Sequence, residues 1–292
     1  MGGSMITARG LTKRYGEKIA VHDLDFTVAP GTVTGFLGPN GAGKSTTMRL
    51  IVGLDRPTTG TVTVNGKPYR DHAAPLHEVG ILLEAKAVHT GRSAYNHLLA
   101  LAQTNNIPRS RVDDMIDLVG LHDVARRRVG GFSLGMGQRL GIAAALLGDP
   151  ATVVLDEPVN GLDPEGVLWI RNLLKSLAAE GRTVFVSSHL MSEMALTAEH
   201  LIVIGRGRLI ADMSVKEFVA GASRDVVRVV TPQPAELRKV LERAEVSTGD
   251  DGALTVRGLS SKYIGEIALR NGIALYELTP QMASPISKER SW

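Results

Sequence analysis

The first third of the chain alternates short apolar runs with turn residues, which is typical of β-strands. Five segments are expected to be strands, and the one at 32–37 is followed by a glycine-rich turn and a helix. In the segment at 61–69, the pair Asn65-Gly66 predicts a hairpin turn. The expected strand-bearing segments are 6–11, 20–28, 32–37, 61–69 and 79–83.

Between residues 93 and 148 the apolar spacing changes to that of helices. One segment repeats apolar residues at Leu98, Leu101 and Ala102, and a second repeats them from Val112 to Val119. Since this stretch interrupts a strand-rich pattern, the sequence predicts an inserted helical subdomain at about 85–150.

Two continuous apolar runs, at 151–155 and 182–188, flank a segment with apolar residues at helical spacing from Val167 to Leu177. Strand, helix and strand in this order predict a parallel sheet and therefore an α/β fold. Asp163 and Pro164 suit the N-cap and first position of the helix, and Gly181 suits its exit.

The last third of the chain predicts a second, smaller domain. A hairpin is expected at 201–212, and a linker at 220–224 separates it from later elements. Beyond the linker, the expected order is strand (226–231), helix (235–243), strand, strand (253–257), helix (260–270) and strand (273–278). This order predicts a small ferredoxin-like α+β domain at 224–280, with a tail at 281–292. The first domain is then expected at 5–220.

Composition narrows the classes of protein only slightly. The 292 residues carry a net charge of +3 and no cysteine, so disulfide bonds and thiolate metal sites are excluded. Nothing in the charge balance demands a nucleic-acid partner, and none is expected. The longest apolar run, at 141–148, is far short of a transmembrane helix, so the chain is not expected to cross a membrane.

The strongest chemical signal is GPNGAGKST at 38–46, which fits the phosphate-loop pattern GxxxxGK[ST] between a strand and a helix. Glycines allow backbone N–H groups to converge on phosphate oxygens at the positive end of the helix. Lys44 is expected at the β and γ phosphates, Ser45 at Mg²⁺ and Thr46 at the α phosphate. The alternative is a glycine turn that only caps a helix. The expected nucleotide-binding residues here are Gly38, Pro39, Asn40, Gly41, Ala42, Gly43, Lys44, Ser45 and Thr46.

A second signal is VVLDEP at 153–158, an apolar strand that ends in two adjacent acids. Nucleotide hydrolysis needs one group that organises a metal ion and another that orients the attacking water. Asp156 is expected to hold Mg²⁺, and Glu157 to orient and polarise the water. Taken alone, the two acids could equally be solvated.

Further motifs separate one ATPase family from others. FSLGMGQR at 132–139 resembles the signature motif of ABC transporter ATPases, NGLD at 160–163 resembles their D-loop, and SSHL at 187–190 resembles their switch loop. Tyr15 in KRYG resembles the aromatic A-loop residue. With the two motifs above, six elements occur in the order of this family across residues 5 to about 220, which implies the P-loop ABC ATPase fold.

The resemblance implies a role for each matching residue. Tyr15 would stack on adenine, and His189 would contact the γ phosphate and fix the geometry of Glu157. Ser133 and Gly135 would contact the γ phosphate held by Lys44 of a second copy, so the active state would be a head-to-tail dimer. Asp163 would help to couple the two sites, in addition to capping its helix.

Two departures from the family pattern stand out. Phe132, Leu134 and Met136 replace the usual signature residues, and SLGM resembles the subgroup that works with ABC-2 type exporters, including antibiotic-efflux pumps. Glu84 occupies the Q-loop position, where the family usually has glutamine. Its carboxylate could still serve Mg²⁺ or the attacking water, but the added negative charge predicts slower or more metal-dependent turnover.

The resemblance implies an ATP-hydrolysing subunit that powers a separate integral-membrane permease at the cytoplasmic face of the cell membrane. The helical subdomain and residues 84–97 would transmit the motion, and the substrate would be a drug, an antibiotic or a lipid-like compound. One alternative is a soluble ABC-type ATPase acting on nucleic acid or ribosomes. Such proteins usually have two cassettes in one chain or long coiled coils, whereas this sequence has one cassette and no sustained heptads. The other is an ATP-binding regulatory module with little catalysis.

Overall fold

The computed structural model describes residues 5–83, 88–223, 226–241, 244–249 and 251–281. The chain forms two compact units, Met1–Met213 and Ser214–Trp292. In the described part of the chain, no helix combines the length and the apolar character needed to cross a membrane.

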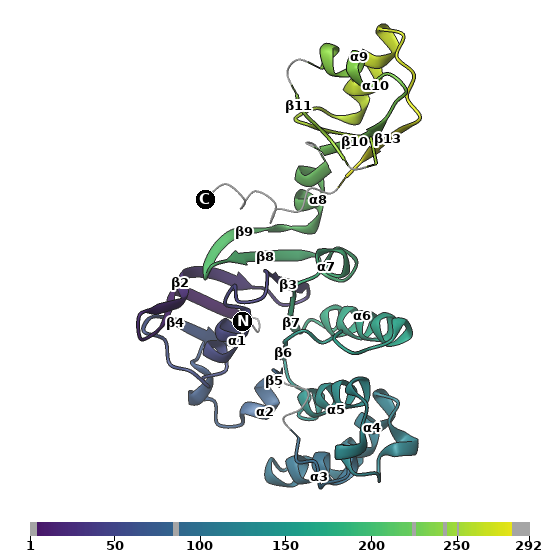
Figure 1. The fold of residues 1–292 in the computed structure, drawn as a ribbon. Coiled ribbons are helices and arrows are strands. Elements are labelled where there is room, and N and C mark those ends of the chain that lie inside the picture. The colour runs from purple at the N-terminus through teal and green to yellow at the C-terminus, as the bar shows by residue number, and fades with distance from the viewer. Residues whose placement is uncertain (1–4, 84–87, 224–225, 242–243, 250, 282–292) are drawn as a thin grey trace. The chain divides into compact units, whose positions relative to one another are not determined.

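A six-stranded sheet in the order β5-β6-β7-β3-β8-β9 forms the centre of the first unit (Figure 1). Strands β5, β6, β7, β3 and β8 run parallel. Every residue of β3, β6 and β7 is buried, because both faces of the sheet are covered. The strand bounds are β3 Val33–Leu37, β5 Val79–Leu82, β6 Thr152–Leu155, β7 Thr183–Ser188, β8 His200–Gly205 and β9 Arg208–Ser214.

One face of this sheet is covered by a second, antiparallel sheet in the order β2-β1-β4 together with helix α1 (Lys44–Ile51). Its strands are β1 Ile6–Tyr15, β2 Lys18–Val28 and β4 Thr59–Val64. The ring centroid of Phe26 in β2 lies 6.0 Å from that of Phe36 in β3 and 5.9 Å from that of Phe185 in β7, and the last two centroids are 5.1 Å apart. These three rings join the two sheets into one core. The expected Asn65-Gly66 turn follows β4, with both residues at positive φ.

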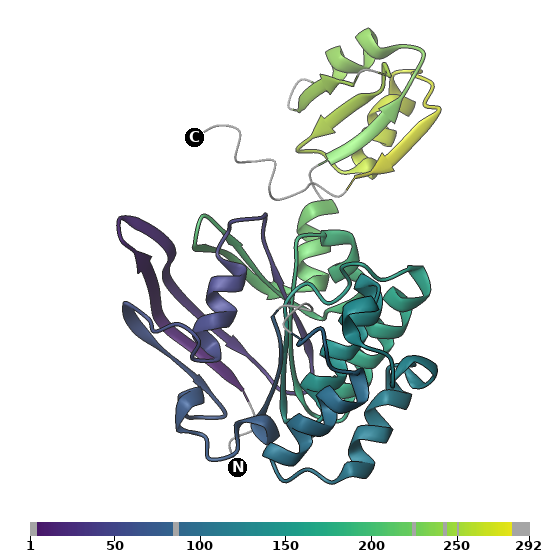
Figure 2. The same cartoon turned by 60° about the horizontal axis from the view of Figure 1, so that its bottom comes forward.

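Helices α5, α6 and α7 cover the opposite face (Figure 1; Figure 2). Helix α6 (Pro164–Ala179) begins and ends as the sequence predicts: Asp163 caps it by accepting the N–H of Gly166 at 2.9 Å, Pro164 is its first residue, and Gly181 follows at φ 89°. Helix α7 (Met191–Thr197) follows β7. The inserted helices are α3 Ala94–Thr104, α4 Arg109–Leu118 and α5 Leu134–Leu146.

Short helical turns connect these elements. They are η1 Tyr69–Asp71, α2 Pro75–Glu78, η2 His122–Val124 and η3 Val129–Gly131. The last two, η2 and η3, together with α3 to α5 account for the helical character of the described residues between 88 and 148.

The linker expected at 220–224 is wrong for the residues that the structure describes, because helix α8 spans Val215–Ser223. The sequence signal for this helix is a capping box: Ser214 Oγ accepts the N–H of Glu217, and the Glu217 carboxylate accepts the N–H of Ser214. The two units accordingly divide at Met213/Ser214 rather than beyond residue 220.

The second unit contains, after α8, the order β, α, β, β, α, β in an antiparallel sheet β11-β12-β10-β13. The bounds are β10 Val226–Val230, α9 Pro234–Val240, β11 Glu245–Thr248, β12 Leu254–Arg257, α10 Ser261–Arg270 and β13 Glu277–Pro280.

The last strand begins later than the expected 273–278, because Ile273 is buried in the core of this unit on a turn that hydrogen-bonds to Ala268. The tail predicted at 281–292 lies, beyond residue 281, outside the described residues.

Candidate active site

Three segments with candidate chemistry follow three neighbouring strands of the parallel sheet. The glycine-rich loop at 38–46 follows β3, Asp156 and Glu157 follow β6, and His189 follows β7. Because β6, β7 and β3 are adjacent and parallel, their carboxyl ends meet at one edge of the sheet. Open α/β sheets bind their ligands at this edge.

The loop at 38–46 is shaped by glycines that tolerate no side chain. A Cβ on Gly38 would lie 2.5 Å from the carbonyl oxygen of Ile204, and one on Gly43 would lie 2.6 Å from that of Ala20. Gly41 and Gly43 also have positive φ values of 82° and 108°. The backbone therefore turns tightly and enters α1 with Gly43 at the N-cap.

The first turn of α1 has no side-chain cap, since Gly43 has none to offer. The N–H groups of this turn lie at the positive end of the helix dipole. Asn40, Gly41 and Ser45 are exposed, Pro39, Gly43 and Thr46 are partly buried, and Gly38, Ala42 and Lys44 are buried. This is the geometry of an anion-binding helix end.

Lys44 and Glu157 form the centre of the site. The Lys44 ammonium, only 6% exposed, donates to the carbonyl oxygens of Gly38 at 2.6 Å and Pro39 at 3.3 Å. It also lies 3.5 Å from Glu157 Oε1. On the other side, His189 Nδ1 donates to Glu157 Oε2 at 2.9 Å. Both oxygens of one carboxylate are thus occupied, one by each of two neighbouring loops.

Asp156 is held by hydrogen bonds to β7 and β5. Its Oδ1 accepts a hydrogen bond from Ser187 Oγ, and its backbone N–H donates to the Leu82 carbonyl at 2.7 Å. This fixes the carboxylate at the end of β6 beside Glu157. The sequence did not single out Ser187, although the Ser-Ser-His run at the end of β7 could have indicated it.

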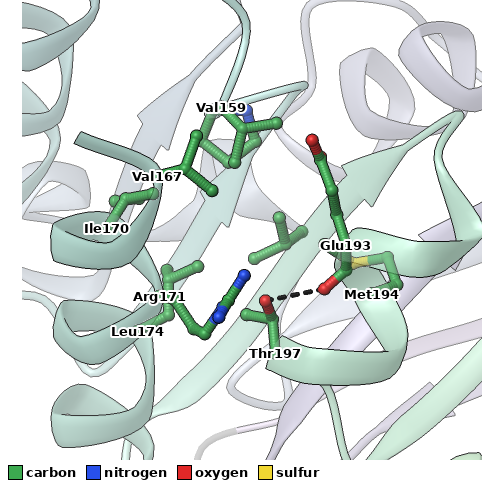
Figure 3. Close-up of a pocket in the computed structure, with 10 residues that line it drawn as sticks. Val159, Val167, Ile170, Arg171, Leu174, Glu193, Met194 and Thr197 are labelled. Atoms are coloured by element: carbon green, nitrogen blue, oxygen red, sulfur yellow. Dashed lines mark hydrogen bonds between the residues drawn. The ribbon is translucent and has the colours of Figure 1, made fainter. Parts of the chain in front are cut away.

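A small cavity of about 10 Å³ lies between α6, α7, β7 and the loop that follows β6 (Figure 3). Arg171 and Glu193 line it, and among the described residues neither the buried Arg171 Nε nor the buried Glu193 Oε2 has a hydrogen-bond partner. The pKa of the Glu193 carboxyl is raised, chiefly by burial and then by Glu157, while His189 and Arg171 oppose the rise. Glu193 belongs to α7, four residues after His189, and its significance could not be predicted from the sequence because it depends on this packing.

Tyr15 ends β1 and is 46% exposed. Its hydroxyl donates to Asp55 Oδ2 at 2.7 Å, which Arg49 also contacts at 2.8 Å, and the ammonium of Lys13 lies 4.8 Å from the ring centroid. The hydrogen bond from Arg49, followed by that from Tyr15, lowers the pKa of Asp55. Asp55 was not identified from sequence, since it is forty residues from Tyr15 along the chain.

The signature and D-loop segments contact each other within the chain. Ser133 caps α5 by accepting the N–H of Met136 at 3.2 Å, and a Cβ on Gly135 would lie 2.9 Å from the carbonyl oxygen of Gly161. Leu134, one of the departures from the usual signature, lies over Gly161. Lys44, Glu157 and His189 form a separate cluster. Among the described residues, no hydrogen bond or ion pair joins this cluster to Ser133, Gly135, Asp163 or Tyr15. Glu84 lies outside the described residues.

The available donors limit how a metal ion could be held. In the described part of the chain, no three His, Asp or Glu side chains come together in a metal-binding group. The candidate oxygen donors are the hydroxyl of Ser45, the second residue of α1, and the carboxylate of Asp156. Oxygen donors of this kind fit Mg²⁺, which keeps several waters and commonly binds with substrate phosphates.

Comparison with known proteins identifies the family. The family described as ABC transporter matches residues 21–160, and a domain of unknown function (DUF8746) matches residues 225–285. The bacitracin transport ATP-binding protein BcrA of Enterococcus faecalis is 35% identical over 280 residues, which cover 93% of this chain and 90% of that protein. The Nod factor export ATP-binding protein I of Burkholderia pseudomallei (strain 1710b) is 35% identical over 259 residues, covering 85% of this chain and 84% of that protein.

Solved structures of ABC transporter cassettes have the same fold. A dimeric bacterial ABC transporter cassette is 25% identical, has a TM-score of 0.66, and covers 72% of this chain and 98% of that chain. The expected α/β P-loop ABC ATPase fold is therefore confirmed, as is the resemblance on which it depended. The chain belongs to the ATP-binding subunits of ABC transporters.

Proposed function

We propose that this chain binds and hydrolyses ATP at the carboxyl edge of the parallel sheet to power an exporter through a separate membrane permease. The observation that carries the proposal is the placement of Glu157 between Lys44 and His189, at the mouth of a loop built to hold phosphates. ATPase activity is typical of the family.

Hydrolysis at this site begins with a change of partner for Lys44. The β and γ phosphates draw its ammonium from Glu157, which frees Oε1 to accept a proton from a water molecule. The water oxygen forms a bond to the γ phosphorus, and the bond to the bridging oxygen of ADP breaks, giving ADP and phosphate. The hydrogen bond from His189 to Oε2 remains, so it limits rotation of the Glu157 carboxylate.

The site also suits Mg²⁺, held by the Ser45 hydroxyl and the Asp156 carboxylate together with phosphate oxygens. Such an ion, when bound, neutralises charge that develops on the phosphates. Glu84 is proposed as a further oxygen ligand near the ion or the water, and its extra negative charge slows turnover relative to glutamine.

The active form is proposed to be a head-to-tail dimer of two copies. Ser133 and Gly135 begin the exposed N-terminal end of α5, where backbone N–H groups can receive the γ phosphate held by a second copy. The proposed nucleotide-binding residues also include Asp163, at the start of α6, and Tyr15, whose ring is partly exposed. A related cassette forms a dimer, which supports this assembly.

The permease is proposed to contact the helical subdomain near residues 88–97, from the cytoplasmic face of the membrane. Arg109 and Arg126 stack on Tyr95 there, with guanidinium carbons 5.5 and 4.6 Å from the ring centroid. The substrate is proposed to be an antibiotic, a drug or a lipid-like compound, since one relative is named for bacitracin transport and another for Nod factor export. The alternative of an ATPase acting on nucleic acid or ribosomes is not favoured by these relatives.

Phosphate release by the purified chain tests the proposal, with and without the co-expressed permease. Glu157→Gln is expected to keep nucleotide binding and to lose hydrolysis by about a hundredfold or more, the scale for loss of a key catalytic group. Glu180→Gln, on the exposed end of α6, serves as the matched control and is expected to behave like the parent. Normal hydrolysis by Glu157→Gln would refute the assignment of Glu157.

A further inference from the structure

The backbone of Glu157 is held in an unusual conformation. Its φ angle is +49°, in the left-handed region that residues with a Cβ seldom adopt. The residue directly follows Asp156 at the end of β6, and its side chain reaches both Lys44 and His189. Without restraint, the backbone would relax to negative φ and turn the carboxylate away from one or both partners.

The amide side of Glu157 is fixed by β7. The Glu157 N–H donates to Ser187 Oγ at 2.9 Å, while the Ser187 hydroxyl donates its own hydrogen to Asp156 Oδ1. Ser187 is fully buried, so water cannot replace it. One hydroxyl thus fixes the positions of both adjacent acids.

The carbonyl side of Glu157 is fixed by the helix that carries the signature residues. Gln138 Nε2 donates to the Glu157 carbonyl oxygen at 3.3 Å, and the N–H of Asn160 donates to the same oxygen at 3.2 Å. Gln138 is 4% exposed and belongs to α5, whose N-cap is Ser133. A single side chain therefore links the helix of the signature segment to the backbone of the proposed base.

We propose that Ser187 and Gln138 are positioning residues that hold the left-handed backbone of Glu157, and so place its carboxylate for hydrolysis. Because Gln138 belongs to α5, a movement of that helix is transmitted to Glu157 through one hydrogen bond. The proposal rests on the hydrolytic role assigned to Glu157 above. It adds a connection between the signature helix and the base within a single chain.

The test compares Gln138→Met and Ser187→Ala with the parent chain in steady-state phosphate release. Methionine keeps the length of glutamine in a buried position but lacks the donor, and alanine removes only the hydroxyl. Gln103→Met on α3 and Ser176→Ala on α6 are matched controls, since both residues are exposed. Thermal unfolding and nucleotide binding verify that each variant is folded.

We expect kcat to fall by about tenfold to a hundredfold in Gln138→Met and Ser187→Ala, since small misplacements of a reacting group have effects of this size. KM for ATP should change by less than about threefold, because Lys44 and the phosphate loop are untouched. Ser187→Thr, which keeps the hydroxyl, should restore most of the activity of Ser187→Ala.

A double-mutant cycle separates positioning from a general structural effect. In the Glu157→Gln background, the residual rate should not fall further when Gln138→Met is added, because the group being positioned is already gone. The proposal is overturned if the same fold-loss appears in that background, if the loss is in KM rather than kcat, or if the single variants match the parent. A parent chain that releases no phosphate would instead overturn the proposed function itself.

Discussion

Replacing Glu157 by glutamine should strengthen the binding of ADP as well as stop hydrolysis. In the described structure, the Lys44 ammonium is shared between the Glu157 carboxylate and the carbonyl oxygens of Gly38 and Pro39. A nucleotide must compete with Glu157 for Lys44, and its phosphates approach a fixed negative charge. Glu157→Gln removes both obstacles while preserving the shape of the side chain.

The size of the effect follows from the ion-pair distance. Two unit charges 3.5 Å apart interact by about 5 kcal/mol at an effective dielectric constant of about 20. Most of this is offset, because Lys44 exchanges one anionic partner for another when the phosphates bind, and because the glutamine amide oxygen remains a hydrogen-bond acceptor. A net gain of about 1 to 2 kcal/mol remains, which corresponds to roughly fivefold to thirtyfold tighter binding.

Calorimetric titration with ADP measures this gain. ADP carries the β phosphate proposed to contact Lys44 but lacks the γ phosphate expected to close the dimer, so dimer trapping does not contribute. Glu180→Gln is the control for a general change in charge, and its affinity for ADP should equal that of the parent. An unchanged or weaker affinity in Glu157→Gln would show that the ion pair does not oppose nucleotide binding, and the reasoning would fail.

Three further outcomes are expected. Lys44→Ala should abolish detectable ATP and ADP binding in the same titration, since its ammonium is the buried cation of the phosphate loop; retained affinity would contradict the assigned role. Phe185→Ala should destabilise the fold by about 3 to 5 kcal/mol in denaturant unfolding, because it removes a fully buried ring between two others, whereas Tyr263→Ala at an exposed site should have little effect. Burial raises the pKa of the Glu193 carboxyl, so the folded state disfavours its ionised form. This lowers the stability of the fold at pH values above the raised pKa. The loss of stability disappears as the pH falls below the ordinary pKa of a glutamate. Glu193→Gln should therefore unfold at a higher temperature than the parent at about pH 7.5, and at the same temperature at about pH 4; an equal gap at both pH values would contradict this cause.

Local patterns were sufficient to predict most elements of the first unit. Continuous apolar runs predicted the buried strands. Asp163 and Pro164 predicted the start of α6, because a helix N-terminus needs a side-chain acceptor and tolerates proline. The helix at 215–223 was missed although Ser214 and Glu217 form a capping box, since glycine and serine near its end resemble a linker. The last strand was placed too early, because Ile273 is buried on a turn rather than in the sheet.

For the site, the sequence by itself identified the candidate groups: a phosphate loop with Lys44, an acidic pair ending in Glu157, and a histidine after the next strand. It identified them because each depends on residue types at fixed short spacings. Only the tertiary structure decided how they meet. The left-handed backbone of Glu157 and its hydrogen bonds to Ser187 and Gln138 join segments 19 and 30 residues away, and such contacts depend on how strands and helices pack rather than on any local pattern.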